Sequence, residues 1–227
     1  MNVKVVGIGG IGCCLLPCLA RFLQYQFKSE KPVRIFLIDG DNFERKNAAR
    51  QDFAEIGNKA MVKCRESARR FKSLQFIPRQ EYLTPENVEF LIDEGDIVFV
   101  GVDNFATRKV ISDRAVQLRD VLVISGGNEY TDGNVRFHLR VRGKDITLPL
   151  ANSFHPEVMS PRDKNPAELG CGEMVESQPQ LVLMNNLVAS HMLAGFYAYL
   201  EGKLDYDEVY LDLLTGQARP VRRSAKC

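Results

Sequence analysis

Residues 3–12 read VKVVGIGGIG, a short apolar run that passes directly into a cluster of glycines. The run Val3–Val6 is typical of a buried strand, and residues 11–26 carry a helix-length apolar pattern. The glycines therefore lie where a strand turns sharply into a helix. At such a turn, main-chain N–H groups and the helix N-terminus can approach phosphate groups closely. This stretch predicts the first unit of an α/β fold that binds a nucleotide.

The alternation of strand and helix patterns continues along the chain. Further apolar runs rich in Val and Ile predict strands at 33–38, 74–77, 97–102 and 121–124. Helix-length patterns occupy the intervals 59–71, 85–93 and 107–119. We expect a doubly wound, mostly parallel Rossmann-like sheet with helices on both faces. Pro17 should kink the first helix or lie near its start.

The pattern changes after residue 130. Residues 134–141 and 145–150 alternate polar and apolar around Arg142-Gly143, which predicts an antiparallel hairpin extending the sheet. Residues 151–178 contain three prolines among polar residues and are expected to form a crossover loop. A helix is expected over 179–200, and a terminal hairpin over 208–222 that turns at Thr215-Gly216.

The expected organisation is a single domain. Its nucleotide-binding core would span residues 1–150, followed by the crossover loop at 151–178 and the C-terminal helix and hairpin at 179–227. A chain of 227 residues with 45% hydrophobic and 26% charged residues is ordinary for a globular protein.

Charge and hydropathy narrow the classes of partner. The chain has 30 Lys and Arg against 29 Asp and Glu, so no overall charge favours nucleic acid or an anionic membrane. No apolar run approaches the roughly 20 residues of a membrane helix. We expect a cytoplasmic protein that uses neither nucleic acid nor membrane.

The six cysteines show neither a disulfide framework nor a Cys-x-x-Cys pair of a zinc site. We therefore expect free thiols and no zinc. Cys13, Cys14 and Cys18 lie in the apolar stretch after the glycines, where small buried side chains are expected.

Acidic residues at two strand ends add to the glycine signal. Asp39 ends the second expected strand, where a carboxylate can accept hydrogen bonds from ribose hydroxyls. The glycines and Asp39 alone leave an NAD-dependent oxidoreductase open. Asp103 ends the fourth strand, at the sheet edge where open α/β sheets bind ligands.

Four further segments, taken in order, narrow the choice of protein family. Asp39-Gly40-Asp41 leads into Asn47-Ala48-Ala49-Arg50-Gln51 and then Ile56-Gly57-Asn58-Lys59-Ala60. The fourth segment is Asp96-Ile97-Val98 with Asp103-Asn104-Phe105-Ala106-Thr107-Arg108. In this order the chain resembles the ThiF/MoeB and ubiquitin-activating enzyme superfamily from residue 3 to about 140, and more loosely to 200. Its compact form is similar to bacterial ThiF-like members.

The resemblance implies an ATP-dependent adenylyltransferase that activates the C-terminal glycine carboxylate of a ubiquitin-like or sulfur-carrier protein. It implies that Asp39 holds the ribose, that Arg50 and Lys59 contact the triphosphate and that Asp103 positions Mg²⁺. The residues implied around the nucleotide are Gly7, Gly9, Gly10, Gly12, Asp39, Asp41, Asn47, Arg50, Gln51, Lys59, Asp103, Asn104 and Arg108. One carboxylate with substrate phosphates is a common way to hold Mg²⁺.

Other interpretations of these residues stay open. Arg50 and Lys59 can be solvated surface charges, Asp103 can cap the helix that begins near Ala106, and Arg108 can pair with it. Lys63 lies one helical turn beyond Lys59 and could replace it.

Cys171 is the candidate for a second step. In relatives, a cysteine of the crossover loop attacks the acyl-adenylate and carries the partner as a thioester or acyl disulfide. Cys171 stands in Gly170-Cys171-Gly172-Glu173, and Pro179 follows eight residues later. A packing role is the alternative. His155 and His191 are not assigned as its partners.

The sequence departs from the superfamily in two ways. It has neither the N-terminal arginine that reaches a partner's ATP nor the Cys-x-x-Cys pairs of many members. Arg21, Arg45 or a partner chain could replace that arginine. The resemblance still implies a homodimer, with a conjugating enzyme or sulfur donor downstream.

Alternatives to a carrier-activating enzyme are a catalytically inactive scaffold subunit and the oxidoreductase. Within the superfamily, a small-molecule or RNA-borne carboxylate is a further possible substrate.

Overall fold

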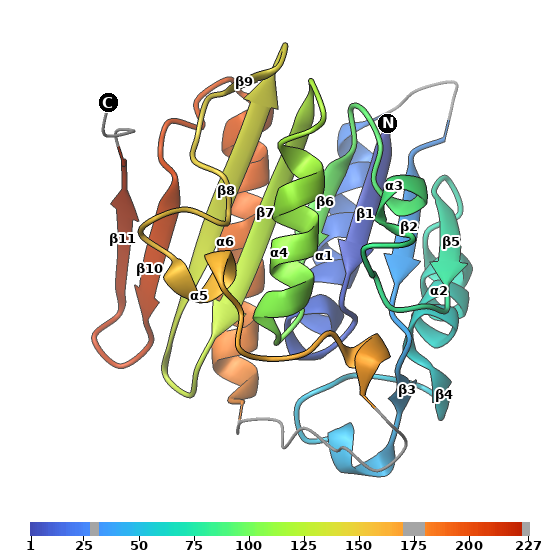
Figure 1. The fold of residues 1–227 in the computed structure, drawn as a ribbon. Helices are drawn as coiled ribbons and strands as arrows, with labels where there is room; N and C mark the ends of the chain where they lie inside the picture. Colours follow the sequence, from blue (N-terminus) through green and yellow to red (C-terminus); the bar gives the residue numbers. More distant parts are fainter. Residues whose placement is uncertain (28–31, 170–179, 224–227) are drawn as a thin grey trace.

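The computed structural model describes residues 1–27, 32–169 and 180–223. Its centre is a nine-stranded sheet, ordered β11-β10-β8-β7-β6-β1-β2-β5, with β9 paired to the C-terminal end of β8 (Figure 1). The parallel strands are β1 (Asn2–Val6), β2 (Arg34–Ile38), β5 (Gln75–Arg79), β6 (Ile97–Val100) and β7 (Val121–Asn128). The antiparallel strands are β8 (Asp132–Val141), β9 (Lys144–Asp145), β10 (Glu208–Asp212) and β11 (Gln217–Val221). The predicted α/β class, with its antiparallel extension, is confirmed.

Helices cover both faces of this sheet (Figure 1). One layer contains α1 (Gly10–Gln26), α2 (Lys59–Arg70) and α6 (Val182–Leu200). The other contains α3 (Val88–Leu91), α4 (Phe105–Ala115) and α5 (Pro156–Met159). Two short strands, β3 (Asn42–Phe43) and β4 (Gly57–Asn58), form a separate pair, and 3₁₀ turns span Arg45–Asn47 (η1) and Pro166–Glu168 (η2).

Alternation along the strands produces two cores. Val3 and Val5 pack in the cluster beneath α1 and α6, whereas Val6 packs in the cluster beneath α4. Phe99 and Val100 divide in the same way on β6. Because successive strand residues point to opposite faces, near-continuous apolar runs indicate strands buried on both sides.

Several boundaries differ from the expected ones. The predicted helix at 85–93 shortens to Val88–Leu91, because the Asn87 side chain accepts from Thr84 N and donates to Tyr82 O, holding a turn before it. The predicted strand at 145–150 reduces to Lys144–Asp145, because β10 already pairs with residues 132–136 on the same edge of β8. Pro17 lies inside α1 rather than near its start.

The prediction of three buried cysteines is wrong for Cys18. Cys13 is buried and Cys14 half-buried, but Cys18 lies on the exposed side of α1. The buried strip of α1 runs through Leu16, Leu19 and Leu23, and Cys18 lies off this strip. Among the described residues, no helix has the length and apolar character to cross a membrane.

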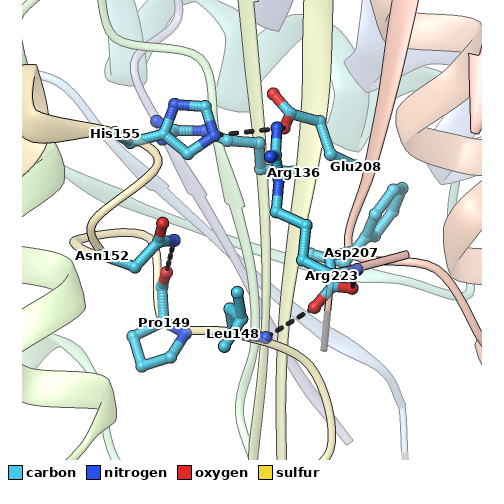
Figure 2. Close-up of a pocket in the computed structure, with 9 residues that line it drawn as sticks. Arg136, Leu148, Pro149, Asn152, His155, Asp207, Glu208 and Arg223 are labelled. Carbon is cyan, nitrogen blue, oxygen red and sulfur yellow. Dashed lines mark hydrogen bonds and ion pairs between the residues drawn. The ribbon is translucent and has the colours of Figure 1, made fainter. Parts of the chain in front are cut away.

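A buried charged cluster ties the start of the crossover segment to the antiparallel edge (Figure 2). Glu208 on β10 is 1% exposed and accepts hydrogen bonds from Asn134 Nδ2 at 2.8 Å and Arg223 Nη2 at 2.9 Å. His155 Nε2 lies 3.1 Å from the same carboxylate, and Arg136 donates to Leu150 O. A buried carboxylate needs such partners to remain charged.

These partners control the acidity of Glu208. Burial alone would raise its pKa, but hydrogen bonds from His155, Arg223 and Asn134 lower the pKa to about 2. A carboxyl with a depressed folded-state pKa stabilises the fold above its unfolded pKa of about 4.5. That contribution is lost as the pH falls from there towards about 2.

We therefore expect Glu208→Gln to remove up to about 3 kcal/mol of the acid-dependent part of stability. The measurement is urea unfolding between pH 7 and pH 3. The variant should be less stable at pH 7 and should lose less stability on acidification than the wild type. Glu55→Gln, on an exposed pair with Arg65, is the matched control. Parallel pH profiles for wild type and Glu208→Gln would contradict this assignment.

Candidate nucleotide-binding site

The candidate site lies at the carboxyl ends of the parallel strands β1, β2 and β6. The turn after β1 is joined to both neighbours, because Gly7 N donates to Ile38 O at 3.0 Å and Gly101 N donates to Val6 O at 2.8 Å. These strand ends thereby bring together the glycine turn, Asp39 and Asp103. Open α/β sheets bind ligands at this edge.

The glycines of the turn have different tasks. Gly7 has a φ of +87°, a conformation that favours glycine. A Cβ at Gly12 would lie 2.2 Å from Gly7 O, so Gly12 lets α1 approach the turn. A Cβ at Gly10 would lie 2.3 Å from Asn185 Nδ2 on α6.

Gly9 leaves the turn open. The nearest atom to a Cβ placed there is Gln51 Nε2 at 3.9 Å. Gly9 is also the N-cap of α1 and offers no side-chain cap hydrogen bond. The first N–H groups of a helix have no partner within the helix and attract anions. A phosphate group therefore fits against Gly9, at the N-terminus of α1.

Asp39 fixes this turn to the end of β2. Its carboxylate accepts from Ile8 N at 2.6 Å and from Asp41 N at 2.8 Å. Desolvation by burial raises the Asp39 pKa to about 6, although Lys59 and the two N–H donors act to lower it. Each carboxylate oxygen has a second acceptor position, so Asp39 retains capacity for a ribose hydroxyl.

Residues 42–58 form an excursion that carries the second predicted motif. Its base is closed where β3 pairs with β4 and where Asn58 Nδ2 donates to Asp39 O and Asp41 O. Phe43 stacks on Phe53 with ring centroids 4.6 Å apart. The excursion is therefore a built loop with a small apolar centre.

Asn47, Arg50 and Gln51 lie on this excursion. Asn47 is buried and its Oδ1 accepts from Glu44 N, so its side chain shapes the loop. Arg50 is half-buried in the turn that follows η1. Gln51 is 8% exposed, and its Oε1 has no hydrogen-bond partner among the described residues. With its Nε2 facing Gly9, the Gln51 amide is a candidate ligand contact.

The two lysines of α2 have different environments. Lys59 Nζ donates to Asp41 Oδ2 at 2.9 Å. Lys63 Nζ instead donates to Asp52 O at 2.9 Å and pairs with Glu66, which pins the excursion to α2. Lys63 thus holds the excursion against α2, whereas Lys59 lies beside the carboxylate of Asp41.

Burial lowers the pKa of Lys59, but the carboxylates of Asp39, Asp41 and Asp103 outweigh this and leave the pKa above its ordinary value. Lys59 is therefore a permanently charged cation near the turn.

Two alternative interpretations of the Asp103 segment, a helix cap by Asp103 and a pair between Asp103 and Arg108, are not what the structure shows. Asn104, not Asp103, caps α4, because its Oδ1 accepts from Thr107 N at 2.8 Å. Arg108 does not hydrogen-bond Asp103; its guanidinium donates to Val102 O, Ser125 Oγ and Gly126 O. Burial lowers the Arg108 pKa to about 9, with nearby Arg136 adding to this. Arg108 links the chain after β6 to β7, whereas Asp103 is exposed beside the site.

Sequence patterns did not predict how the crossover segment crosses this edge. Asp163 accepts from Phe105 N at 2.6 Å and Ala106 N at 2.9 Å. Asn165, 2% exposed, donates to Leu83 O and Thr107 Oγ1. Asn165 also precedes Pro166 and caps η2, a local signal that could have been recognised. Cys171 and its flanking residues lie outside the described residues.

The acidic residues do not form a preassembled metal centre. No group of three or more His, Cys, Asp or Glu side chains suited to a metal occurs in the described parts of the chain. Mg²⁺ with a nucleotide commonly needs only one or two carboxylates, because phosphates and water complete its shell. Exposed Asp103 fits that limited role.

The sequence model of the ThiF family matches residues 1–210. The chain belongs to the ThiF family. Among curated relatives, "Adenylyltransferase and sulfurtransferase uba4" of Ogataea parapolymorpha is 27% identical over the whole chain, which covers 57% of that protein. The protein of the same description from Pyricularia oryzae is 33% identical over 138 residues, or 59% of this chain and 26% of its own length. The chain thus spans about a quarter to just over half of these relatives.

Solved structures support the same fold. Escherichia coli MccB with ATP has a TM-score of 0.72 at 19% identity, covering all of this chain and 65% of that one. Selenomethionine PaaA has a TM-score of 0.68 at 17% identity, covering 97% of this chain and 63% of its own.

Two glycine substitutions distinguish the proposed phosphate cradle, at Gly9 and the N-terminus of α1, from the packing of the glycine turn. Gly9→Ala adds a methyl group where no protein atom lies within 3.9 Å, so stability should stay near that of the wild type while ATP binding falls at least tenfold. Gly12→Ala pushes against Gly7 O and should lower stability itself. Thermal unfolding and ATP titration measure the two effects. Wild-type ATP affinity in folded Gly9→Ala would refute the cradle.

Proposed function

We propose that the protein is an ATP-dependent adenylyltransferase that activates the C-terminal carboxylate of a small carrier protein or peptide. The open side of Gly9 at the uncapped end of α1, with Lys59 near Asp103, is the observation that carries this proposal. Membership of the ThiF family supports it. The ubiquitin-like or sulfur-carrier class with a glycine-ended tail is the preferred substrate.

In the proposed reaction, a carboxylate oxygen of the substrate attacks the α-phosphorus of ATP. The new O–P bond gives an acyl-adenylate, and the bond to the bridging oxygen breaks to release pyrophosphate. Asp39 would orient the ribose, and the N-terminus of α1 would hold phosphate oxygens. Lys59 and Arg50 would stabilise the charge that develops on pyrophosphate, since fixed cations need no reorganisation during the step.

Asp103 would hold Mg²⁺ at this edge, and the ion would supply positive charge that neutralises the phosphate groups. The acidic surroundings of Lys59 suit this arrangement, because a metal-bound triphosphate is less strongly repelled by Asp39, Asp41 and Asp103 than a free one.

We also propose a homodimer. Arg21 is the one Lys, Arg, Asp or Glu of α1, and α6 has none, although charged residues make up 26% of the chain. Tyr197 is nevertheless 49% exposed and Leu183 58%. The nearly uncharged pair of helices α1 and α6 suits contact with a second copy, because matching faces meet without like-charge repulsion.

Carrier-dependent ATP–pyrophosphate exchange tests the reaction. Asp103→Ala should lower exchange about 100-fold or more while part of the ATP binding remains. Asp113→Ala, on the exposed side of α4 and paired with Lys109, is the control and should exchange normally. Normal exchange by Asp103→Ala would defeat the assignment of Asp103. ATP binding without exchange for any glycine-ended carrier would favour the scaffold alternative. Binding of a reduced nicotinamide cofactor would favour the oxidoreductase.

For the second step we propose that the Cys171 thiolate attacks the carbonyl of the acyl-adenylate, forming a thioester with the carrier and releasing AMP. Cys171→Ala should retain pyrophosphate exchange but lose a carrier conjugate that a thiol reductant releases. Non-reducing electrophoresis of a labelled carrier measures this. Cys18→Ala removes a demonstrably exposed thiol and should keep the conjugate. Persistence of the conjugate in Cys171→Ala would make Cys171 a packing residue.

A further inference from the structure

Tyr82, in the loop after β5, lies directly on the acidic end of β2. A Cβ placed at Gly40 would come within 2.8–2.9 Å of three carbons of the Tyr82 ring, so the ring covers Gly40 closely. The loop is held there because Asn87 Nδ2 donates to Tyr82 O at 2.9 Å and Asn87 Oδ1 accepts from Thr84 N. Tyr82 is thus a fixed neighbour of the nucleotide edge.

The Tyr82 hydroxyl donates to Asp41 Oδ1, while the other oxygen of Asp41 accepts from Lys59 Nζ at 2.9 Å. Asp41 therefore has two donors on opposite oxygens. Its side chain is 49% exposed, whereas that of Lys59 is 10% exposed. The chain forms a continuous contact from Tyr82 through Asp41 to the buried cation.

A triphosphate and Asp41 would compete for the same ammonium group. When Lys59 turns to phosphate oxygens, Asp41 loses one of its two donors and remains charged beside other anions. The Tyr82 hydroxyl is the donor that stays, and a hydrogen bond to a charged acceptor is stronger than one between neutral groups. Tyr82 thereby stabilises the arrangement in which Lys59 has left Asp41.

We propose that Tyr82 is a positioning residue that sets how readily Lys59 changes partner from Asp41 to the triphosphate of ATP. This deepens the proposed function and rests on it. Tyr82 acts through Asp41 and Lys59, so its effect should depend on the β- and γ-phosphates that Lys59 would contact.

Tyr82→Phe keeps the ring on Gly40 and removes only the hydroxyl. The dissociation constant and the KM for ATP should rise about 3- to 10-fold, because Asp41 then retains Lys59 more strongly. At saturating ATP, kcat for pyrophosphate exchange should stay within about twofold. AMP affinity should be unchanged, since AMP lacks the phosphates concerned. Calorimetric titration with ATP and AMP, together with exchange kinetics, measures the three quantities.

Two further variants make the test specific. Tyr130→Phe alters a tyrosine that is 57% exposed between β7 and β8, and should leave all three quantities unchanged. In an Asp41→Asn background, the charged competitor is gone, so adding Tyr82→Phe should have little further effect on ATP affinity.

Several outcomes would overturn the inference. Equal weakening of ATP and AMP would mean that Tyr82 contacts the nucleoside part directly, and a parallel fall in kcat and thermal stability would mean a purely structural role. An undiminished effect of Tyr82→Phe in the Asp41→Asn background would exclude Asp41 as the intermediary. Failure of the wild type to bind ATP would instead remove the proposed function, and this inference with it.

Discussion

The carboxylate of Asp39 is the constraint on which the rest of the site depends. By accepting from Ile8 N and Asp41 N, it joins the glycine turn after β1 to the chain after β2. Gly7 N donates to Ile38 O beside it, so two adjacent strand ends are fixed in one register. Both the α1 N-terminus and Asp41 take their positions from this junction. The cost is a buried carboxyl whose pKa is raised to about 6.

From this junction, charge organises the neighbouring segments. Asp41 pairs with Lys59 at the start of α2, and Lys63 one turn later pins the excursion that carries Arg50 and Gln51. Lys59 and Lys63 therefore each have a defined partner before any substrate is considered. Such pre-organisation is what electrostatic stabilisation of a charged transition state requires. The proposed exchange of partners at Lys59 would act on the pair that it forms with Asp41.

Much of the architecture followed from local patterns. Buried parallel strands, the glycine turn and the acidic strand ends are all local in sequence, and together they predicted the fold and the edge that bears the candidate site. Lys59 and Lys63 could not be separated in this way, because both lie on one helical face. Their partners distinguish them: Asp41 for Lys59, and Asp52 and Glu66 for Lys63. Tyr82 contacts Asp41, 41 positions away in the sequence, and the hydrophobic periodicity of the chain does not predict such a contact.

The errors had similar causes. The expected strand at 145–150 failed because β10, more than 60 residues later, takes the edge of β8. The assignment of Arg108 to the nucleotide stays a prediction; its buried guanidinium donates to Val102 O, Ser125 Oγ and Gly126 O. Sequence order identified the motif, whereas the direction of each side chain depended on contacts made across the sheet.

Amide hydrogen exchange of residues 7–13 with and without ATP and magnesium tests the central claim most directly. The phosphates should bind the first N–H groups of α1, so ATP should slow exchange at Gly9, Gly10 and Ile11. AMP should protect them less, because it lacks two phosphates. Protection by ATP elsewhere in the chain with none at these three amides would contradict a phosphate cradle at the glycine turn.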